Sequence, residues 1–381
     1  MSEEICAKLL TVPKTTKTRV LKQDKSLTTY YLSNADVFEI MIGDRVLSTD
    51  IVEDGDIPVY SANVHEEFGR INKKNIIDFS RPSVVWGIDG DWMVDYIPEN
   101  KPFYPTDHCG VIRIKNDNIL PKYLVYALQV EGEYERFSRA NRASTQRIAS
   151  LIIQVPELEK QKKIVAEMEA IDKQVKDEDN KLKKYDEDIK SKFVEMFDME
   201  KYISDGETSD YNLVPISELC QDGRGRVISN DYITRNSGVY PVYSSQTSND
   251  GIMGYIDTFD FDGEYITWTT DGAKAGTVFY RNGKFNCTNV CGTLKVVSEK
   301  VNVKYLTYIL GKIAHLYVNH VGNDKLMNVE MRKINIPIPA IELQNEFAIY
   351  VNSIDKLRFA SEQKKKELLE QKKALFDKYF R

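Results

Sequence analysis

Two long segments of the chain carry apolar residues at alternating intervals of four and three positions, with polar residues on the seam in the middle of the second, and contain no internal glycine or proline. This spacing predicts two amphipathic helices, each with a heptad seam suited to pairing with another helix. A helix of about forty residues extends roughly 60 Å, so each can serve as a spacer and a docking surface. The residues expected at the pairing or partner-docking seams are Ile164, Met168, Ile171, Val175, Leu182 and Ile189 in the first helix, and Phe347, Val351, Ile354, Leu368 and Leu375 in the second.

Each segment follows a region in which short Val, Ile and Tyr runs alternate with Asp-Gly or Asn-Gly turns. Runs such as 83–87, 111–114 and 293–297 predict strands, and 123–130 and 305–316 predict shorter helices. The pattern changes at Pro156, which we place in the first helical turn, where a missing N–H donor is tolerated. The expected organisation is an N-terminal extension (1–35), a first mixed domain (36–155), a central helix (156–199), a second mixed domain (200–338) and a C-terminal helix (339–381).

The two halves of the chain repeat each other. The tetrapeptide Pro-Val-Tyr-Ser begins at Pro58 and again 183 positions later at Pro241. Other matches keep the same order with one residue of slippage, and they are Trp86 and Trp268, Cys109 and Cys291, Lys122 and Lys304, Gln161 and Gln344, and Phe193 and Phe376. An ordered series of this length indicates a duplicated unit of one domain plus one helix. We therefore predict an α+β fold with two pseudo-repeated mixed α/β domains joined by two long antiparallel helices.

Composition narrows the class of protein. A hydrophobic fraction of 42% in 381 residues is typical of a globular chain. No apolar run is long enough to cross a bilayer, the first ten residues do not resemble a secretory signal, and the five scattered cysteines suit a reducing compartment, so we expect a cytoplasmic protein. The net charge of −6 does not favour general adhesion to nucleic acid, so any DNA-binding cations must be locally concentrated.

The sequence lacks the common catalytic motifs. It has no phosphate-binding P-loop, no His-Glu-x-x-His, no nucleophile elbow and no Asn-Pro-Pro-Tyr or Asp-Pro-Pro-Tyr. His108-Cys109 and the Cys287, Cys291 pair could suggest zinc, but no second spaced pair accompanies them and His108 aligns with Val290 in the repeat. We expect no metal site, no bound cofactor and no catalytic residue in this chain.

Polar loop residues are the better candidates for chemistry, because guanidinium and amide groups can pair with base edges in the major groove of DNA. A basic, amide-bearing stretch precedes the first long helix, and its counterpart precedes the second. Two further loop pairs follow the shared Pro-Val and Trp positions, and there the scaffold residues agree between the repeats while the polar residues differ. The candidate DNA-binding residues are Ser61, Asn63, Arg136, Arg139, Asn141, Arg142, Thr145, Gln146 and Arg147 in the first half, and Ser244, Ser245, Gln246, Lys274, Asn323, Lys325 and Asn328 in the second.

With these motifs in this order twice over, the chain from about residue 36 to 381 resembles the specificity subunits of type I restriction-modification systems and their type IIB-like relatives. The resemblance implies two target-recognition domains, each reading one part of a bipartite sequence in double-stranded DNA, and helices that set the spacer. It implies that two methyltransferase (modification) subunits dock on the helices, flip an adenine in each half-site and use S-adenosylmethionine. It also implies a motor-nuclease subunit that joins for cleavage. This chain would itself be non-catalytic and have no membrane partner.

Two alternatives stay open at this level. A coiled-coil adaptor that binds proteins without DNA would fit the overall acidity, and a domain pair cut from a fused restriction enzyme would fit the duplication. The diverged polar loops favour the DNA reader, because a two-part target needs one reading domain for each part. The lysine-rich segment 1–29 has no counterpart in the second half, and it could be a basic arm or a packing segment.

Overall fold

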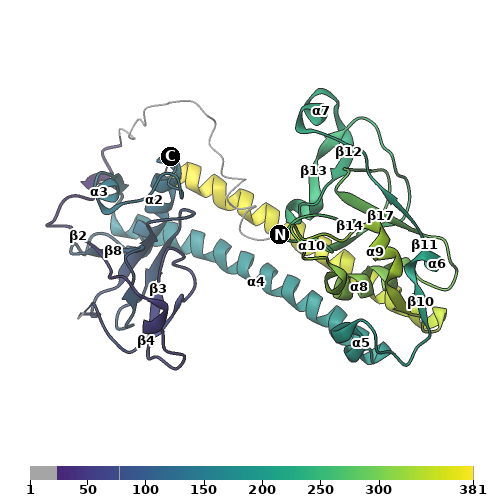
Figure 1. Ribbon diagram of the computed structural model, residues 1–381. Coiled ribbons are helices and arrows are strands. Elements are labelled where there is room, and N and C mark those ends of the chain that lie inside the picture. The colour runs from purple at the N-terminus through teal and green to yellow at the C-terminus, as the bar shows by residue number, and fades with distance from the viewer. Residues whose placement is uncertain (1–23, 77, 381) are drawn as a thin grey trace. The chain divides into compact units, whose positions relative to one another are not determined.

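The computed structural model describes residues 24–76 and 78–380, so residues 1–23 of the lysine-rich segment 1–29 lie outside this range. The described chain forms two compact units. The first unit comprises the described residues up to Asp177 together with 365–380, and the second comprises Glu178–Lys364. Each unit therefore contains one mixed α/β domain and one part of each long helix, as Figure 1 shows for the elements that it labels.

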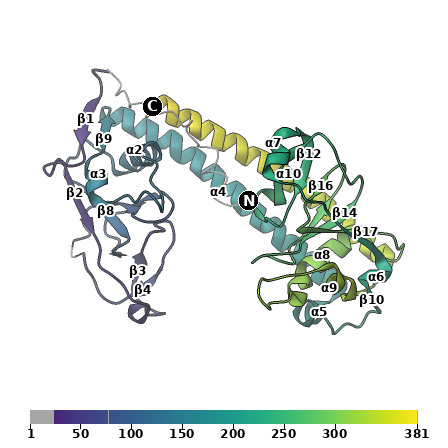
Figure 2. The same cartoon turned by 45° about the horizontal axis from the view of Figure 1, so that its top comes forward.

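The first domain is built on a four-stranded antiparallel sheet of order β2-β8-β5-β6. A three-stranded sheet of order β4-β3-β7 and the antiparallel pair β1-β9 complete it, and α2 packs on β5 and β6. Figure 2 shows β1 beside β9. The elements are β1 (Thr28–Tyr31), β2 (Phe38–Ile42), the 3-10 helix η1 (Ser48–Asp50), β3 (Ile57–Tyr60), β4 (Gly69–Ile71), β5 (Ser83–Gly87), β6 (Val94–Ile97), β7 (Tyr104–Pro105), β8 (Cys109–Ile114), α2 (Pro121–Tyr134), α3 (Thr145–Ala149) and β9 (Ile152–Val155).

The second domain repeats this topology strand for strand. Its sheets have the orders β11-β17-β14-β15, β13-β12-β16 and β10-β18, and α8 packs on β14 and β15 as α2 packs on β5 and β6. The elements are α5 (Glu200–Asp205), β10 (Leu213–Pro215), α6 (Ile216–Leu219), β11 (Cys220–Arg224), α7 (Asn230–Arg235), β12 (Ser237–Tyr243), η2 (Ser248–Gly251), β13 (Ile252–Ile256), β14 (Tyr265–Thr269), β15 (Val278–Arg281), β16 (Asn286–Cys287), β17 (Cys291–Val296), α8 (Val303–Ile313), η3 (Ala314–Tyr317), α9 (Asn328–Lys333) and β18 (Asn335–Pro337).

The repeated tryptophans explain why the scaffold residues recur. Trp86 is fully buried, lies opposite Gly110 in the β5-β8 ladder and donates from Nε1 to the carbonyl of Ala143 at 2.8 Å. Trp268 pairs with Gly292 in the same way and donates to Leu326 O at 2.9 Å. A Cβ on either glycine would fall within 2.4 Å of the indole ring, so only glycine fits. These contacts join the central sheet of each domain to the loop before its long helix.

A buried glutamine fixes each domain to its own long helix. The side chain of Gln161 accepts from Leu120 N at 2.8 Å and donates to Asn118 O at 2.8 Å and Pro156 O at 2.7 Å. Gln344 makes the equivalent three contacts in the second unit. Both side chains are fully buried, so their polar atoms are satisfied by backbone groups rather than by water.

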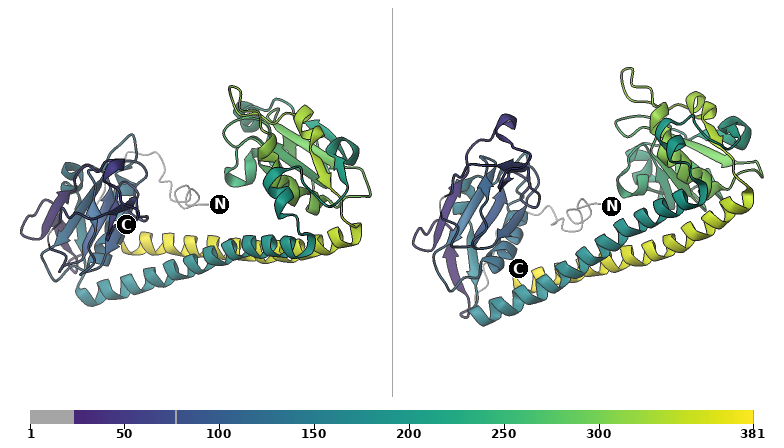
Figure 3. Two further views of the ribbon diagram at one scale, coloured as in Figure 1. Left: turned by 60° about the horizontal axis from the view of Figure 1, so that its bottom comes forward. Right: turned by 90° about the horizontal axis from the view of Figure 1, so that it is seen from below.

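The long helices are α4 (Leu158–Phe197) and α10 (Ile341–Tyr379), and they run antiparallel. In the first unit the start of α4 lies beside the end of α10 (Figure 3). There Tyr379 donates from its hydroxyl to Glu167 at 2.7 Å. In the second unit a later part of α4 meets an earlier part of α10, where Arg358 bonds Asp186 at 2.6 Å. Each domain core therefore receives residues from both helices.

The predicted seams lie on the packed faces of the helices. Ile164, Met168, Ile171, Ile189, Phe347, Ile354 and Leu368 are buried, and Val175, Leu182, Val351 and Leu375 are half-buried. The fold prediction and the duplication are thus confirmed. Two details differ. Pro156 precedes the first helical turn instead of lying in it, and β1 begins at Thr28, so the first domain starts before the expected boundary at residue 36.

Candidate nucleic-acid interface

Four loops meet in the first domain where β3 and β5 end and β8 begins. Backbone hydrogen bonds link them: Thr106 N donates to Tyr60 O at 2.9 Å, and Ala143 N donates to Ile88 O at 3.0 Å. A Cβ at Gly87 would lie 2.1 Å from the carbonyl oxygen of Ala62, so glycine permits this close approach. We call the loops 60–64, 87–92, 106–108 and 138–147 the first loop cluster.

The second domain brings together the equivalent loops. Thr288 N donates to Tyr243 O at 2.8 Å, Thr270 N donates to Val290 O at 3.1 Å and Leu326 N donates to Thr270 O at 3.1 Å. We call the loops 243–247, 270–276, 288–290 and 319–327 the second loop cluster. The candidate residues, which are scattered along the sequence, therefore gather at one place in each domain, with the exceptions of Arg136 and Asn328.

Two of the candidates in the basic stretch brace their own loop. The amide of Asn141 donates to Glu135 O at 2.9 Å and Arg136 O at 3.0 Å. The guanidinium of Arg147 bonds the Asn141 amide oxygen, donates to Arg142 O at 3.0 Å and lies 4.6 Å from the centre of the Phe137 ring. These groups are occupied within the protein, which favours a structural role for both residues.

Arg142 is held by an acidic residue from a neighbouring loop. Its Nη2 donates to Asp89 Oδ2 at 2.8 Å and its Nε pairs with Asp89 Oδ1, while His108 Nδ1 also bonds this carboxylate. Burial opposes ionisation of the Asp89 carboxyl, but the hydrogen bonds from His108 and Arg142 outweigh it and hold its pKa below the usual range. The Arg142 side chain nevertheless remains 58% exposed.

The other candidates in the basic stretch project outward. Arg136, which has a left-handed backbone with φ of 58°, Arg139 and Gln146 are exposed. Thr145 is half-buried, and its hydroxyl lies 3.4 Å from the Gln146 amide oxygen. Within the described part of the chain, the Arg136 and Arg139 side chains have no ion-pair partner, so they are available to phosphates or bases.

The polar residues after β3 and β12 are partly occupied. Ser61 accepts from Thr106 Oγ1 at 3.1 Å, and the Asn63 amide oxygen accepts from His65 N at 3.0 Å. In the second domain, Ser244 accepts from Gln246 N at 3.3 Å, Ser245 donates to Val290 O at 2.5 Å and the Gln246 amide bonds Ile252 O. These side chains shape the loops, and Asn63 is the exposed member of the set.

The remaining candidates of the second half fall into two groups. Lys274, Asn323 and Lys325 are exposed on the second loop cluster. Asn328 instead begins α9, where its amide donates to Asp222 Oδ2 at 2.7 Å, and Arg332 pairs with the same carboxylate at 2.6 Å. The pairing of this carboxylate ties α9 to β11 and favours a bracing role for Asn328.

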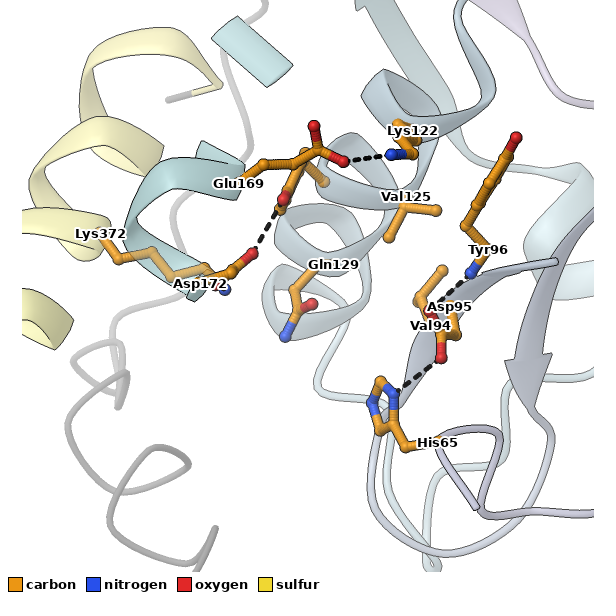
Figure 4. Close-up of a pocket in the computed structure, with 11 residues that line it drawn as sticks. His65, Val94, Asp95, Tyr96, Lys122, Val125, Gln129, Glu169, Asp172 and Lys372 are labelled. Atoms are coloured by element: carbon orange, nitrogen blue, oxygen red, sulfur yellow. Dashed lines mark hydrogen bonds and ion pairs between the residues drawn. The ribbon is translucent and has the colours of Figure 1, made fainter. Parts of the chain in front are cut away.

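The cavity in the first unit is lined by paired charges instead of free ones (Figure 4). It measures about 440 Å³ and lies between β6, α2 and the long helices. Lys122 pairs with Glu169, and Asp172 accepts from Tyr126 Oη at 2.8 Å and pairs with Lys372. Lys304 pairs with Asp355 at 2.6 Å at the corresponding place in the second unit. We interpret these contacts as braces between domain and helix.

Metal-binding clusters and membrane-spanning helices are both absent from the described residues. No group of three His, Cys, Asp or Glu side chains there is arranged to hold a metal ion. The sulfur atoms of Cys287 and Cys291 lie 3.3 Å apart in the core. None of the described helices is both long enough and apolar enough to span a membrane.

Comparison with known proteins identifies the family. The profile of the type I restriction modification DNA specificity domain matches the chain twice, over residues 31–184 and 208–371. The chain belongs to this family. The two matches coincide with the two repeats, so each domain with its long helix is one specificity domain.

Relatives within the family support the assignment. The type I restriction enzyme MpnII specificity subunit of Mycoplasma pneumoniae is 44% identical over 143 residues, which is 37% of this chain and 43% of that subunit. A second chain of that organism, provisionally named a type I specificity subunit, is 42% identical over 159 residues, or 42% of this chain and 43% of the relative. These alignments cover less than half of each relative's length.

A solved structure shows the same fold. The S subunit of a type I restriction-modification system from M. genitalium matches with a TM-score of 0.62 at 14% identity, covering 95% of this chain and 98% of that one. Identity at this level carries only the fold, so the roles of individual loop residues rest on the geometry of this chain.

The structure adds residues that the sequence did not single out for the site. Asp89 was visible as half of a repeated Asp-Gly turn within a candidate loop, and His108 only as a weak zinc candidate. The Asp89 carboxylate bonds both His108 and Arg142, which places Asp89 and His108 in the first loop cluster. Asp89 and Arg142 are 53 positions apart, so no local pattern could have joined them.

Proposed function

We propose that this chain is the DNA-specificity subunit of a type I restriction-modification assembly and that each loop cluster reads one part of a bipartite target. The observation that carries the proposal is that the two domains share one scaffold but present different polar residues in their loops. Trp86 and Trp268 make equivalent contacts, whereas the loops beside them present Arg142 in one domain and Lys325 in the other. Two domains of the same fold with different polar loop side chains suit the recognition of two different base sequences.

The exposed basic residues and the exposed amides suit different tasks in DNA binding. Phosphate contacts from Arg or Lys supply most of the affinity without reading sequence, and base-edge contacts supply the discrimination. Arg136, Arg139, Lys274 and Lys325 are exposed and suited to phosphates, whereas Gln146 and Asn323 carry exposed amides that can pair with adenine.

Catalysis would belong to partner subunits. We place two methyltransferase subunits on the paired helices, one for each half of the target, and with them the S-adenosylmethionine and the flipped adenine. A motor-nuclease subunit would join the assembly for cleavage. Genomic DNA as the substrate would place the working assembly in the cytoplasm. The adaptor alternative is not favoured, because the specificity-domain family accounts for both repeats.

The test uses the full chain co-purified with its methyltransferase partners. Selection from a library of randomised duplexes should return a consensus with two specified parts separated by an unspecified spacer. Equal recovery of all sequences, although the complex binds DNA, would contradict the proposal.

The role of the exposed cations can be tested in the same assay. Arg139→Ala should weaken binding to all sequences alike and lower the salt dependence by about one counterion. Arg81→Ala is the matched control, because Arg81 lies before β5 at the other end of the sheet, where its Nη1 donates to Ile114 O at 3.3 Å. A loss of affinity confined to one base position would refute a phosphate contact for Arg139.

A further inference from the structure

The bond between Arg142 and Asp89 leaves a defined edge of the guanidinium free. The carboxylate takes Nε and one hydrogen of Nη2. An arginine carries five N–H donors, so both Nη1 hydrogens and the second Nη2 hydrogen stay unused by this pair. With the side chain 58% exposed, the outer Nη1–Nη2 edge of Arg142 is open to a ligand.

The free edge has the geometry of a known recognition element. Two parallel N–H donors at the end of a planar guanidinium match the two acceptors of guanine, O6 and N7, in the major groove. A flexible arginine must lose side-chain entropy before making such a contact. The Asp89 carboxylate has already oriented the guanidinium here, so less entropy remains to be lost on binding.

Contacts from other loops keep this pair in place. His108 Nδ1 bonds the Asp89 carboxylate from one side, and its Nε2 lies 3.8 Å from Asp107 Oδ1. Ile88 N donates to His108 O at 3.0 Å, which fixes the loop that carries Asp89. On the arginine side, Arg147 donates to the carbonyl of Arg142.

We propose that Arg142 reads a guanine in the part of the target bound by the first domain, and that Asp89 and His108 are its positioning residues. The second domain has no equivalent triad. Asp271 and Val290 occupy the positions of Asp89 and His108, and the loop 319–327 contains no arginine. The guanine requirement therefore belongs to one half of the target. This inference rests on the proposed function.

Two other roles for Arg142 make different predictions. A phosphate contact would affect all sequences equally and depend on charge, so lysine would replace arginine with little loss. A purely structural ion pair would affect thermal stability and leave the base preference unchanged. Guanine reading needs the planar pair of donors, so Arg142→Lys keeps the charge and loses the preference.

The experiment compares variants of the full chain, co-purified with methyltransferase subunits, on a randomised duplex library. The wild type should select guanine at one position of one half-site. Arg142→Lys should lower the preference for guanine there by about 5- to 150-fold and leave the other half-site unchanged. Asp89→Asn and His108→Gln should lower the same preference less, at the same position. Arg81→Lys is the matched control and should change nothing.

The outcomes separate the inference from the proposed function. An unchanged consensus for Arg142→Lys, or a loss spread evenly over all sequences, overturns the inference while a bipartite wild-type consensus still supports the function. A wild type without any sequence preference overturns the function itself. Melting temperatures of all variants within a degree or so of the wild type rule out unfolding as the cause, and a lowered melting temperature without a change in consensus counts against guanine reading.

Discussion

Replacing Gln161 with Met tests how the first domain is fixed to the helix that carries it. The change keeps the length of the side chain and removes the three hydrogen bonds to Leu120 N, Asn118 O and Pro156 O. A buried donor left without a partner costs about 1–3 kcal/mol, and unpaired carbonyls add less. Since Gln161 is fully buried, water cannot replace the amide, and we expect a loss of about 2–4 kcal/mol in the free energy of unfolding.

The assay is urea unfolding combined with hydrogen exchange read by peptide, so that each unit is followed separately. Gln344→Met should produce a similar loss in the second unit, and the double variant should be additive within about 0.5 kcal/mol because the sites are in different units. Gln174→Met is the control, since Gln174 is an exposed glutamine of the same helix α4. Losses below about 0.5 kcal/mol for both buried glutamines would refute the reasoning.

Three further predictions follow from the packing. Gly110→Ala should cost about 3 kcal/mol or more in a thermal unfolding experiment, because its Cβ would lie 2.1 Å from the Trp86 ring; an unchanged melting temperature would contradict this close packing. Burial raises the pKa of the Cys109 and Cys220 thiols to about 12, so a maleimide should label them at pH 8 only after denaturant is added, and rapid labelling of the native protein would count against it. Ile171→Asp should lower the free energy of unfolding by about 3 kcal/mol, because it places a charge in the helix seam. The assay is thermal unfolding followed by circular dichroism, and a melting curve identical to that of the wild type would contradict the prediction.

The periodicity of the sequence predicted much of the fold. Apolar spacing located both long helices because burial of one helical face needs residues at intervals of three and four. The repeat predicted the shared topology, since Trp86 with Gly110 and Trp268 with Gly292 need each other in space. Gln161 and Gln344 were visible as a repeated pair, but their bonds to backbone groups more than forty positions away were not.

Prediction of the site was less complete because tertiary contacts decide what each polar side chain can do. By residue type alone, Asn141 and Arg147 were as strong candidates for DNA binding as Arg139. In the fold, however, both side chains are engaged in hydrogen bonds within their own loop. The role of Asp89 depends on Arg142, which only the folded loops bring near. Local patterns identify which residues are polar, and only the fold shows which of them remain free to bind.

The most direct measurement of the central claim is the pattern of methylation that the proposed assembly would leave on genomic DNA. Cells that carry this chain with its methyltransferase partners should show one bipartite motif, and removing this chain should abolish it. Arg142→Lys should then alter one half of the motif. The double variant Lys274→Ala with Lys325→Ala should lower the affinity for the other half. A single uninterrupted motif, or methylation by this purified chain in the absence of other subunits, would contradict the account.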